Sequence, residues 1–215
     1  MSETNFLFII EDHPLYKQAL ISLMKLSFPE QDVRGFSSSE EAFEFFSNQS
    51  NTSLSNSLAL MDLTLPGLSG IELIHKTTQS FPDLQVAVIS GSEDKYLVGT
   101  CLGAGVKAFI VKNTAPDRIV DLIGRALRDG LPEQTWINAN GVQNLNDIPR
   151  IKLTSRQLEV LRLVCKGYTN KQIADHLETV EATAKAHVSA ILRELKVENR
   201  TQAVLLAQSL GFEAK

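Results

Sequence analysis

The sequence predicts two domains: a five-stranded, parallel, doubly wound α/β domain with strand order 2-1-3-4-5, then a small all-α domain of four helices. Short apolar runs alternate with longer amphipathic stretches through residues 1–130, a pattern typical of βα units around a parallel sheet. This periodicity lapses over residues 131–152, which we interpret as a linker. Helical signals resume sharply in residues 153–215.

Helix start signals mark several element boundaries of the first domain. Ser38 with Glu41 can form a capping box, and Thr114 stands just before Pro116, where a helix should begin. The polar residues 48–57 are expected to form an exposed loop. The expected strands are short and mostly apolar, as strands covered on both faces should be: 6–10, 32–36, 58–61, 86–89 and 108–111. The expected helices cover residues 15–27, 39–46, 70–80, 95–102 and 116–128.

Two further capping boxes open the second domain. Thr154 pairs with Gln157, and the same spacing recurs at Thr169 and Gln172. Four helices are expected here, at residues 155–166, 170–177, 181–195 and 200–210.

The charges are divided unevenly between the two domains. Residues 1–130 carry 10 Lys and Arg against 16 Asp and Glu, whereas residues 153–215 carry 9 against 7. The acidic excess of the first domain suits a site built of carboxylates. The slight basic excess of the second domain weakly indicates a nucleic-acid partner. The first residues resemble neither a secretory signal nor a membrane span, so we expect a cytoplasmic protein with no membrane partner. Cys101 and Cys165 lie in apolar stretches and are expected to be reduced core residues.

Several polar residues follow the expected strands directly. Glu11 and Asp12 follow the first strand, and Asp62, Ser90 and Lys112 follow the third, fourth and fifth. Ligands of open parallel sheets bind beyond the carboxyl ends of the strands, where the strand order reverses. Three carboxylates would converge there, and their mutual repulsion calls for a hard cation, of which Mg²⁺ is the natural one. Such a site supports phosphoryl transfer, with Asp62 as the nucleophile.

Residues 1–130 resemble a receiver domain of the two-component systems. The matching segments are IIEDHP at 9–14, MDLTLPGLSG at 61–70, VISGSED at 88–94 and GAGVKAFIVK at 103–112. The resemblance implies that Asp62 accepts a phosphoryl group from the phosphohistidine of a sensor histidine kinase. It also implies that Glu11 and Asp12 help to hold Mg²⁺ with Asp62.

The same resemblance implies roles for neighbouring residues. The carbonyl of Thr64 would complete the metal site, Ser90 and Lys112 would bind the phosphoryl group, and Phe109 would be the aromatic switch residue beside Ser90. Phe109 can equally be an ordinary buried strand aromatic. One departure from the family is Gly91, which stands where Ala is usual and adds backbone freedom beside the site.

Residues 153–210 resemble the four-helix helix-turn-helix domain of LuxR-type regulators, a family that binds double-stranded DNA. The matching segments are LTSRQLEVLRLVCKGYTNKQIADHL, TAKAHVSAILREL and VENRTQA. The helix over 181–195 would enter the major groove, with an apolar face at Ala184, Val188, Ile191, Leu192 and Leu195 turned inward. The expected DNA contacts are Thr169, Asn170, Lys171, Thr183, Lys185, His187, Ser189 and Arg193.

This second domain departs from its family in three places. Val180 stands where a Ser cap is usual, Thr179 replaces an apolar residue, and Glu194 falls where Lys is common. An acid near phosphates opposes binding to DNA, so affinity is expected to be modest or dependent on dimerisation. The apolar surface of the last helix is a candidate homodimer face.

The sequence thus favours a phosphorylation-controlled DNA-binding transcription regulator, not an enzyme beyond its own phosphorylation and dephosphorylation. The alternatives are a constitutive DNA-binding regulator whose receiver is only an interaction platform, and a tail that binds protein or RNA. A Mg²⁺-dependent phosphohydrolase would need a general acid two residues after Asp62, where Thr64 stands. The sequence leaves open whether phosphorylation drives dimerisation or releases a masked DNA-binding helix.

Overall fold

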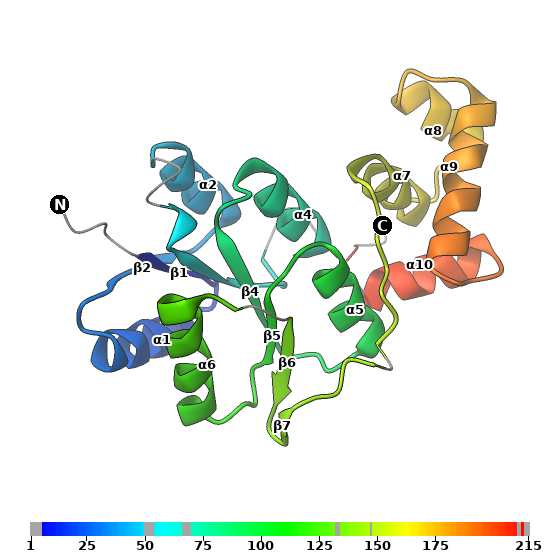
Figure 1. The fold of residues 1–215 in the computed structure, drawn as a ribbon. Coiled ribbons are helices and arrows are strands. Elements are labelled where there is room, and N and C mark those ends of the chain that lie inside the picture. Colours follow the sequence, from blue (N-terminus) through cyan, green and yellow to red (C-terminus); the bar gives the residue numbers. More distant parts are fainter. Residues whose placement is uncertain are drawn as a thin grey trace.

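A seven-stranded sheet organises the first domain (Figure 1). The computed structural model describes residues 6–49, 54–65, 70–131, 134–146, 148–209 and 212. The strands are β1 (Phe6–Ile10), β2 (Asp32–Phe36), β3 (Leu58–Asp62), β4 (Gln85–Ser90), β5 (Ala108–Val111), β6 (Thr135–Asn138) and β7 (Gly141–Val142). The helices are α1 (Pro14–Ser27), α2 (Ser39–Ser47), α4 (Gly70–Ser80), α5 (Lys95–Gly103) and α6 (Pro116–Asp129).

The strand order is β2-β1-β3-β4-β5-β6-β7, so the predicted doubly wound 2-1-3-4-5 arrangement is confirmed. All neighbouring strands are parallel except β6 and β7. Alternate strand residues face opposite layers, since Phe8 packs in a core with α2, α4 and α5, and Ile9 packs in a second core with α1 and α6. Figure 1 shows these two sets of helices on opposite faces of the sheet. The order reverses between β1 and β3, so a ligand site is expected where these two strands end.

The predicted linker over 131–152 is wrong in part, because β6 and β7 lie within it. β6 adds to the free edge of β5, with Ala108 opposite Thr135 and Phe109 opposite Trp136. This strand could not be predicted because β6 has only four residues and ends on an asparagine, so its apolar pattern is too short to indicate a strand. The described chain therefore holds seven strands in one sheet rather than five.

The polar residues 48–57 also differ from the prediction where they are described. Leu54 is buried in the core and Ser57 is buried, where its Oγ accepts a hydrogen bond from the amide of Phe6 at 3.0 Å. Residues 50–53 lie outside the described part of the chain.

The second domain contains α7 (Ser155–Cys165), α8 (Asn170–His176), α9 (Glu181–Glu194) and α10 (Arg200–Ser209). Both predicted capping boxes are present, at Thr154 and at Thr169. The predicted end of the last helix, Leu210, lies outside the described residues. Cys101 and Cys165 are free and buried, as predicted, and burial raises the pKa of the Cys165 thiol to about 11. The described helices include none long and apolar enough to cross a membrane.

The chain between the domains runs in contact with α5. A Cβ atom added to Gly99 would lie 1.9 Å from the carbonyl oxygen of Pro149, and one added to Gly103 would lie 2.2 Å from that of Ile151. Ile151 and Leu153 are buried in the same core as α5. Only glycine lets the two backbones approach this closely, so the segment after β7 is seated on α5 rather than free.

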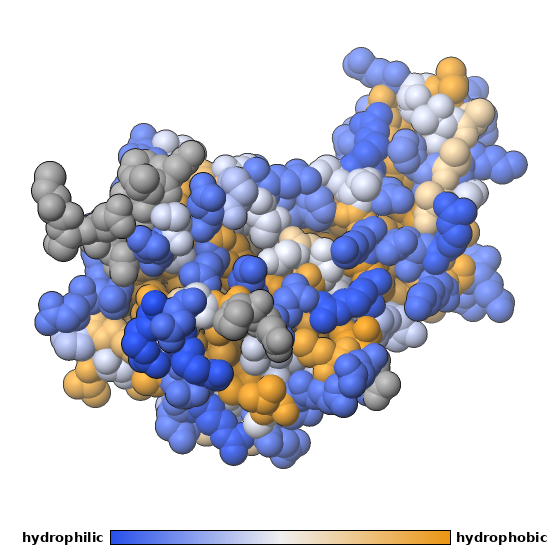
Figure 2. Space-filling view, in the orientation of Figure 1, coloured by the Kyte–Doolittle hydropathy of each residue, from blue (hydrophilic) through white to orange (hydrophobic). Residues whose placement is uncertain are grey.

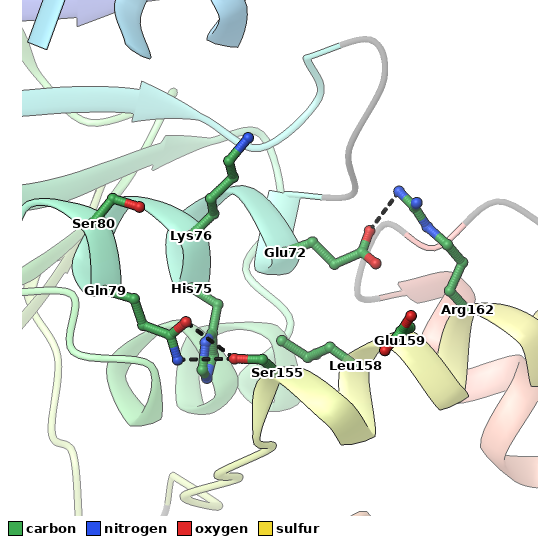
Figure 3. A pocket seen from close by; sticks show the side chains of 9 residues that line it. All are labelled: Glu72, His75, Lys76, Gln79, Ser80, Ser155, Leu158, Glu159 and Arg162. Atoms are coloured by element: carbon green, nitrogen blue, oxygen red, sulfur yellow. Dashed lines mark hydrogen bonds and ion pairs between the residues drawn. The ribbon is translucent and has the colours of Figure 1, made fainter. Parts of the chain in front are cut away.

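A second contact joins the domains through α4 and α7 (Figure 3). Arg162 Nη2 lies 2.9 Å from Glu72 Oε2, and Gln79 exchanges hydrogen bonds with the hydroxyl of Ser155. Leu158 lies between these two polar contacts in a groove lined by both helices. The second domain is therefore held by its first helix, α7.

Replacing Gly99 with Ala should destabilise the protein by roughly 1–3 kcal/mol, because the new methyl group overlaps a backbone carbonyl that cannot move aside as a side chain would. Urea unfolding of the full chain measures this. Gly91→Ala is the matched control, since a Cβ there has no atom within 4 Å, and it should change stability by less than about 1 kcal/mol. Equal stability of the two variants would contradict the close contact of linker and α5.

Candidate functional site

An ammonium group lies between two buried carboxylates at the switch point of the sheet. Lys112 Nζ lies 2.8 Å from Glu11 Oε2 and 3.1 Å from Asp62 Oδ2. Glu11 follows β1, Asp62 ends β3 and Lys112 follows β5, so the parallel strands bring them to one edge. The side chains of Glu11 and Asp62 are 0% exposed, whereas that of Lys112 is 24% exposed. The structure thus brings together three of the five residues predicted to converge.

The two oxygens of the Asp62 carboxylate have different surroundings. Oδ2 accepts hydrogen bonds from Lys112 Nζ and from the Thr64 hydroxyl at 2.5 Å. Oδ1 is buried and has no hydrogen-bond partner among the described residues. A buried carboxylate oxygen without a partner is costly, so this atom is suited to an additional ligand. The side-chain contact of Thr64 was not expected, because the resemblance concerned its carbonyl.

Asp12 provides a second carboxylate oxygen of this kind. Its Oδ1 is buried and has no hydrogen-bond partner among the described residues, with His13 Nδ1 3.9 Å away. Glu11, Asp12 and His13 each offer one possible ligand atom within 4.8 Å of the others. Both Glu11 oxygens already accept bonds, one from Lys112 and one from the amide of His13. The donor set is rich in carboxylate oxygen, which fits a hard divalent cation such as Mg²⁺. The described residues therefore contain an acidic cluster of Glu11 and Asp12 beside His13, and Asp62 is linked to Glu11 through Lys112.

Electrostatics keep Lys112 charged in this setting. Burial lowers the pKa of Lys112, but its hydrogen bonds and charge interactions with Glu11 and Asp62 outweigh burial, so the pKa is raised overall. The ammonium also lies 4.7 Å from the ring centre of Tyr16 on α1, a cation–π contact. Burial raises the pKa of Tyr16. Tyr16 was missed from sequence; its only signal was its place just after Pro14, at the start of the helix that follows Glu11 and Asp12.

Ser90 and Phe109 lie on the strands next to this group. Ser90 ends β4 and is buried, and its Oγ accepts a hydrogen bond from the amide of Ser92 at 3.2 Å. Phe109 on β5 is fully buried, and in the sheet it is paired with Val88 on one side and Trp136 on the other. Ser90 is thus near the carboxyl edge as predicted, while Phe109 belongs to the core; a switching role for either stays a prediction.

The face of α9 predicted to contact DNA is open in this structure. Lys185, Ser189 and Arg193 are exposed, and Thr183 and His187 are half-buried. The opposite face is inward as predicted, with Ala184, Ile191 and Leu195 buried and Val188 and Leu192 partly buried. α9 packs mainly on α8, α7 and α10, and Figure 1 shows it directed away from the sheet. A pale stripe along α9 in Figure 2 agrees with its alanine-rich surface.

The start of α8 adds further exposed polar groups. Thr169 caps the helix through its bond to the Gln172 amide, Lys171 is exposed, and Asn170 is half-buried. These positions stay candidate phosphate contacts.

The unusual residues of this domain are placed as follows. Val180 precedes α9 without a side-chain cap and is 65% exposed, so the missing cap is confirmed. Glu194 was expected only to oppose DNA, but its Oε1 accepts a hydrogen bond from the amide of Lys152 at 2.8 Å. Glu194 therefore ties the end of α9 to the chain that enters the domain.

Two family descriptions match this chain. Residues 7–124 match the response regulator receiver domain, and residues 152–207 match the bacterial regulatory proteins of the luxR family. Residues 125–151, which include β6 and β7, lie between the two matched segments.

Curated relatives match over nearly the whole length. The chain is 32% identical to a glycerol metabolism activator of Pseudomonas putida, with 96% of both chains covered. It is 28% identical to the nitrate/nitrite response regulator protein NarL of Escherichia coli K12, with 92% of both covered. Among solved structures, a complex of the two-component response regulator RcsB with DNA has a TM-score of 0.61 at 20% identity, covering 98% of this chain and 100% of that one. This last likeness concerns the fold alone.

Replacing Lys112 with Met should lower the free energy of unfolding by about 3 kcal/mol, because two buried carboxylates would lose their shared ammonium. The matched control is Arg125→Met, which breaks the exposed pair with Asp121 and should cost less than about 1 kcal/mol. Urea unfolding at neutral pH without divalent ions compares the two. A Lys112 variant as stable as the Arg125 variant would contradict this account of the site.

Proposed function

Since this chain belongs to the NarL/FixJ family of two-component response regulators, we propose that a sensor histidine kinase phosphorylates Asp62 and that this controls binding of α9 to double-stranded DNA. The family membership establishes a regulator with a receiver and a LuxR-type DNA-binding domain. The observation that carries the phosphorylation proposal is the Asp62 carboxylate, with one oxygen held by Lys112 and Thr64 and the other without a partner.

The proposed transfer uses this asymmetry. Asp62 Oδ1 attacks the phosphorus of a phosphohistidine, an O–P bond forms as the N–P bond breaks, and the histidine nitrogen takes up a proton. Lys112 and the Ser90 hydroxyl would contact the phosphoryl oxygens as the phosphoryl group moves from the histidine nitrogen to Asp62. The protein would turn over no separate substrate, apart from gaining and losing its own phosphoryl group.

Mg²⁺ is the proposed cofactor of this step. Asp12 offers an open oxygen and Glu11 adds negative charge beside it. Asp62 would bind the ion through the carboxylate oxygen that does not attack phosphorus, and the Thr64 carbonyl is the remaining ligand expected from the family. When bound, the ion would neutralise charge on the phosphoryl group.

The proposed DNA-binding face is the outward side of α9. Lys185 and Arg193 would supply charge to the phosphates or bases, and the exposed alanines would allow close approach to the groove. Paired half-sites on DNA call for two copies, so a homodimer is part of the proposal. In the described part of α10, Leu205 is 62% exposed while Ala203 and Ala207 are buried, so Leu205 is the apolar side chain there that a partner copy would contact.

One observation favours the second candidate function, a constitutive DNA-binding regulator. The outward residues of α9 are accessible while α7 is held against α4, so binding would not require release from the receiver. If phosphorylation controls DNA binding, it would therefore act by changing the orientation or pairing of the two domains rather than by uncovering a masked α9.

Incubation with phosphoramidate and Mg²⁺ should add one phosphate to the protein, measured by intact mass, because phosphoramidate carries the same N–P bond as phosphohistidine. Asp62→Asn should add none. Asp121→Asn, which removes a carboxylate that is 67% exposed on α6, should be labelled like the original protein. Labelling of Asp62→Asn, or no labelling of the original chain, would reject Asp62 as the acceptor.

Arg193→Ala and Lys185→Ala should each weaken binding to duplex DNA and reduce its salt dependence by about one phosphate contact. Lys25→Ala, an exposed lysine on α1, is the control and should leave binding unchanged. Fluorescence anisotropy over a salt series measures this. Phosphoramidate should tighten binding of the original chain but not of Asp62→Asn, whereas a constitutive regulator would bind DNA equally with and without phosphoramidate and in the Asp62→Asn variant.

A further inference from the structure

The β6–β7 hairpin pairs with Phe109, one of the two residues expected to respond to phosphorylation. Trp136 of β6 is the sheet neighbour of Phe109, and directly paired residues point to the same face of a sheet. Both belong to one buried core. Trp136 Nε1 is buried without a hydrogen-bond partner among the described residues, so the indole sits in this core with its donor unused. A displacement of the Phe109 side chain would therefore act directly on Trp136.

A carboxylate ties the hairpin to the loop that follows Ser90. Glu93 Oε2 accepts a hydrogen bond from Asn138 Nδ2 at 2.9 Å, and Glu93 Oε1 accepts one from Asn113 Nδ2 at 3.1 Å. Asn113 is the residue after Lys112, and Asn138 ends β6. One side chain thus joins the loops after β4 and β5 to the hairpin.

Asn138 is a buried polar centre of the hairpin itself. Its Oδ1 accepts bonds from the Asn140 amide and from Gln143 Nε2, both at 2.9 Å. Arg118 of α6 donates to the carbonyl of Ala139 at 3.1 Å. A buried amide with three hydrogen bonds holds its neighbours in one arrangement, so a displacement of Asn138 would move the hairpin as a unit.

From the hairpin the chain leads directly to the DNA-binding domain. The Gln143 amide donates to the Trp136 carbonyl at 2.8 Å, and Arg150 hydrogen-bonds the side chain of Gln134, just before β6. The residues that follow lie against Gly99 and Gly103 of α5, and α5 itself begins next to Glu93, with Asp94 as its cap. The hairpin, α5 and the entry to α7 are therefore physically continuous.

We propose that the β6–β7 hairpin transmits phosphorylation of Asp62 to the DNA-binding domain, and that Glu93 is the positioning residue that links it to the phosphoacceptor site. The inference rests on the proposed function. When the Ser90 hydroxyl turns to a phosphoryl oxygen, its bond with the Ser92 amide is broken, and the loop carrying Glu93 shifts. Glu93 carries that shift to Asn138, and the hairpin passes it to the chain seated on α5.

The test uses Trp136, which is the only tryptophan of the chain, as an internal probe. Phosphoramidate with Mg²⁺ should change the emission of the original protein, and intact mass on the same sample should show the added phosphate. In Glu93→Gln, the new amide NH₂ faces one of the two donors, Asn113 Nδ2 or Asn138 Nδ2, and that hydrogen bond is lost. This variant should take up phosphate normally, yet lose at least half of the emission change and of the phosphorylation-dependent gain in DNA affinity.

A swapped pair tests the link itself. In the double variant Glu93→Gln with Asn138→Asp, the new amide donates to the new carboxylate, so both the emission change and the gain in DNA affinity should return. Glu30→Gln removes the same negative charge from another exposed side chain, in the loop between α1 and β2, and is the charge control. Urea unfolding checks each variant; if Asn138→Asp prevents folding, the comparison of Glu93→Gln with Glu30→Gln decides alone.

The outcomes separate the two proposals. Phosphate uptake with unchanged Trp136 emission, or full coupling in Glu93→Gln, would overturn the role of the hairpin and leave the proposed function standing. Failure of the original chain to take up phosphate would overturn both.

Discussion

The Lys112 ammonium, held by Glu11 and Asp62, is the interaction on which the rest of the first domain depends. Two carboxylates with no access to water would repel each other strongly, and an ammonium within hydrogen-bond distance of both makes their burial tolerable. The parallel sheet supplies the three strand ends that bring these groups together, and α1 adds the ring of Tyr16 over the ammonium. The compensation is incomplete, because Asp12 and Asp62 each retain a buried oxygen that accepts no hydrogen bond from the described part of the chain. The same carboxylates therefore bear on both the stability of this site and the reactivity proposed for it.

Much of this site could be predicted from sequence because it follows from topology. Residues at the ends of apolar strands must meet at one edge of a parallel sheet, so Glu11, Asp62 and Lys112 could be placed together without knowing any side-chain contact. The capping boxes at Thr154 and Thr169 were equally legible, since each is a local pattern of four residues. The buried face of α9 followed from its helical periodicity.

The features that could not be predicted are contacts between residues distant in sequence with no periodic signal. Glu93 meets Asn138 across 45 positions, and Lys152 meets Glu194 across 42. Glu194 illustrates the difficulty, because its charge indicated repulsion of DNA whereas its position makes it a partner of a backbone amide. β6 was missed for a related reason: a four-residue strand is stabilised by the edge it joins, and that edge is not visible in its own residues.

Close contact of the inter-domain chain with Gly99 and Gly103 bears on how modular this protein is. From β6 to Leu153, the apolar residues Trp136, Ile148, Ile151 and Leu153 are buried in the core that includes α5, so this part of the chain belongs structurally to the first domain although it leads to the second. A chimaera joined near residue 131 would replace β6 at the edge of β5, and also the residues that pack on Gly99 and Gly103 of α5, with those of another protein. A junction after Leu153 would instead keep these contacts, so recombination between relatives should be tolerated there.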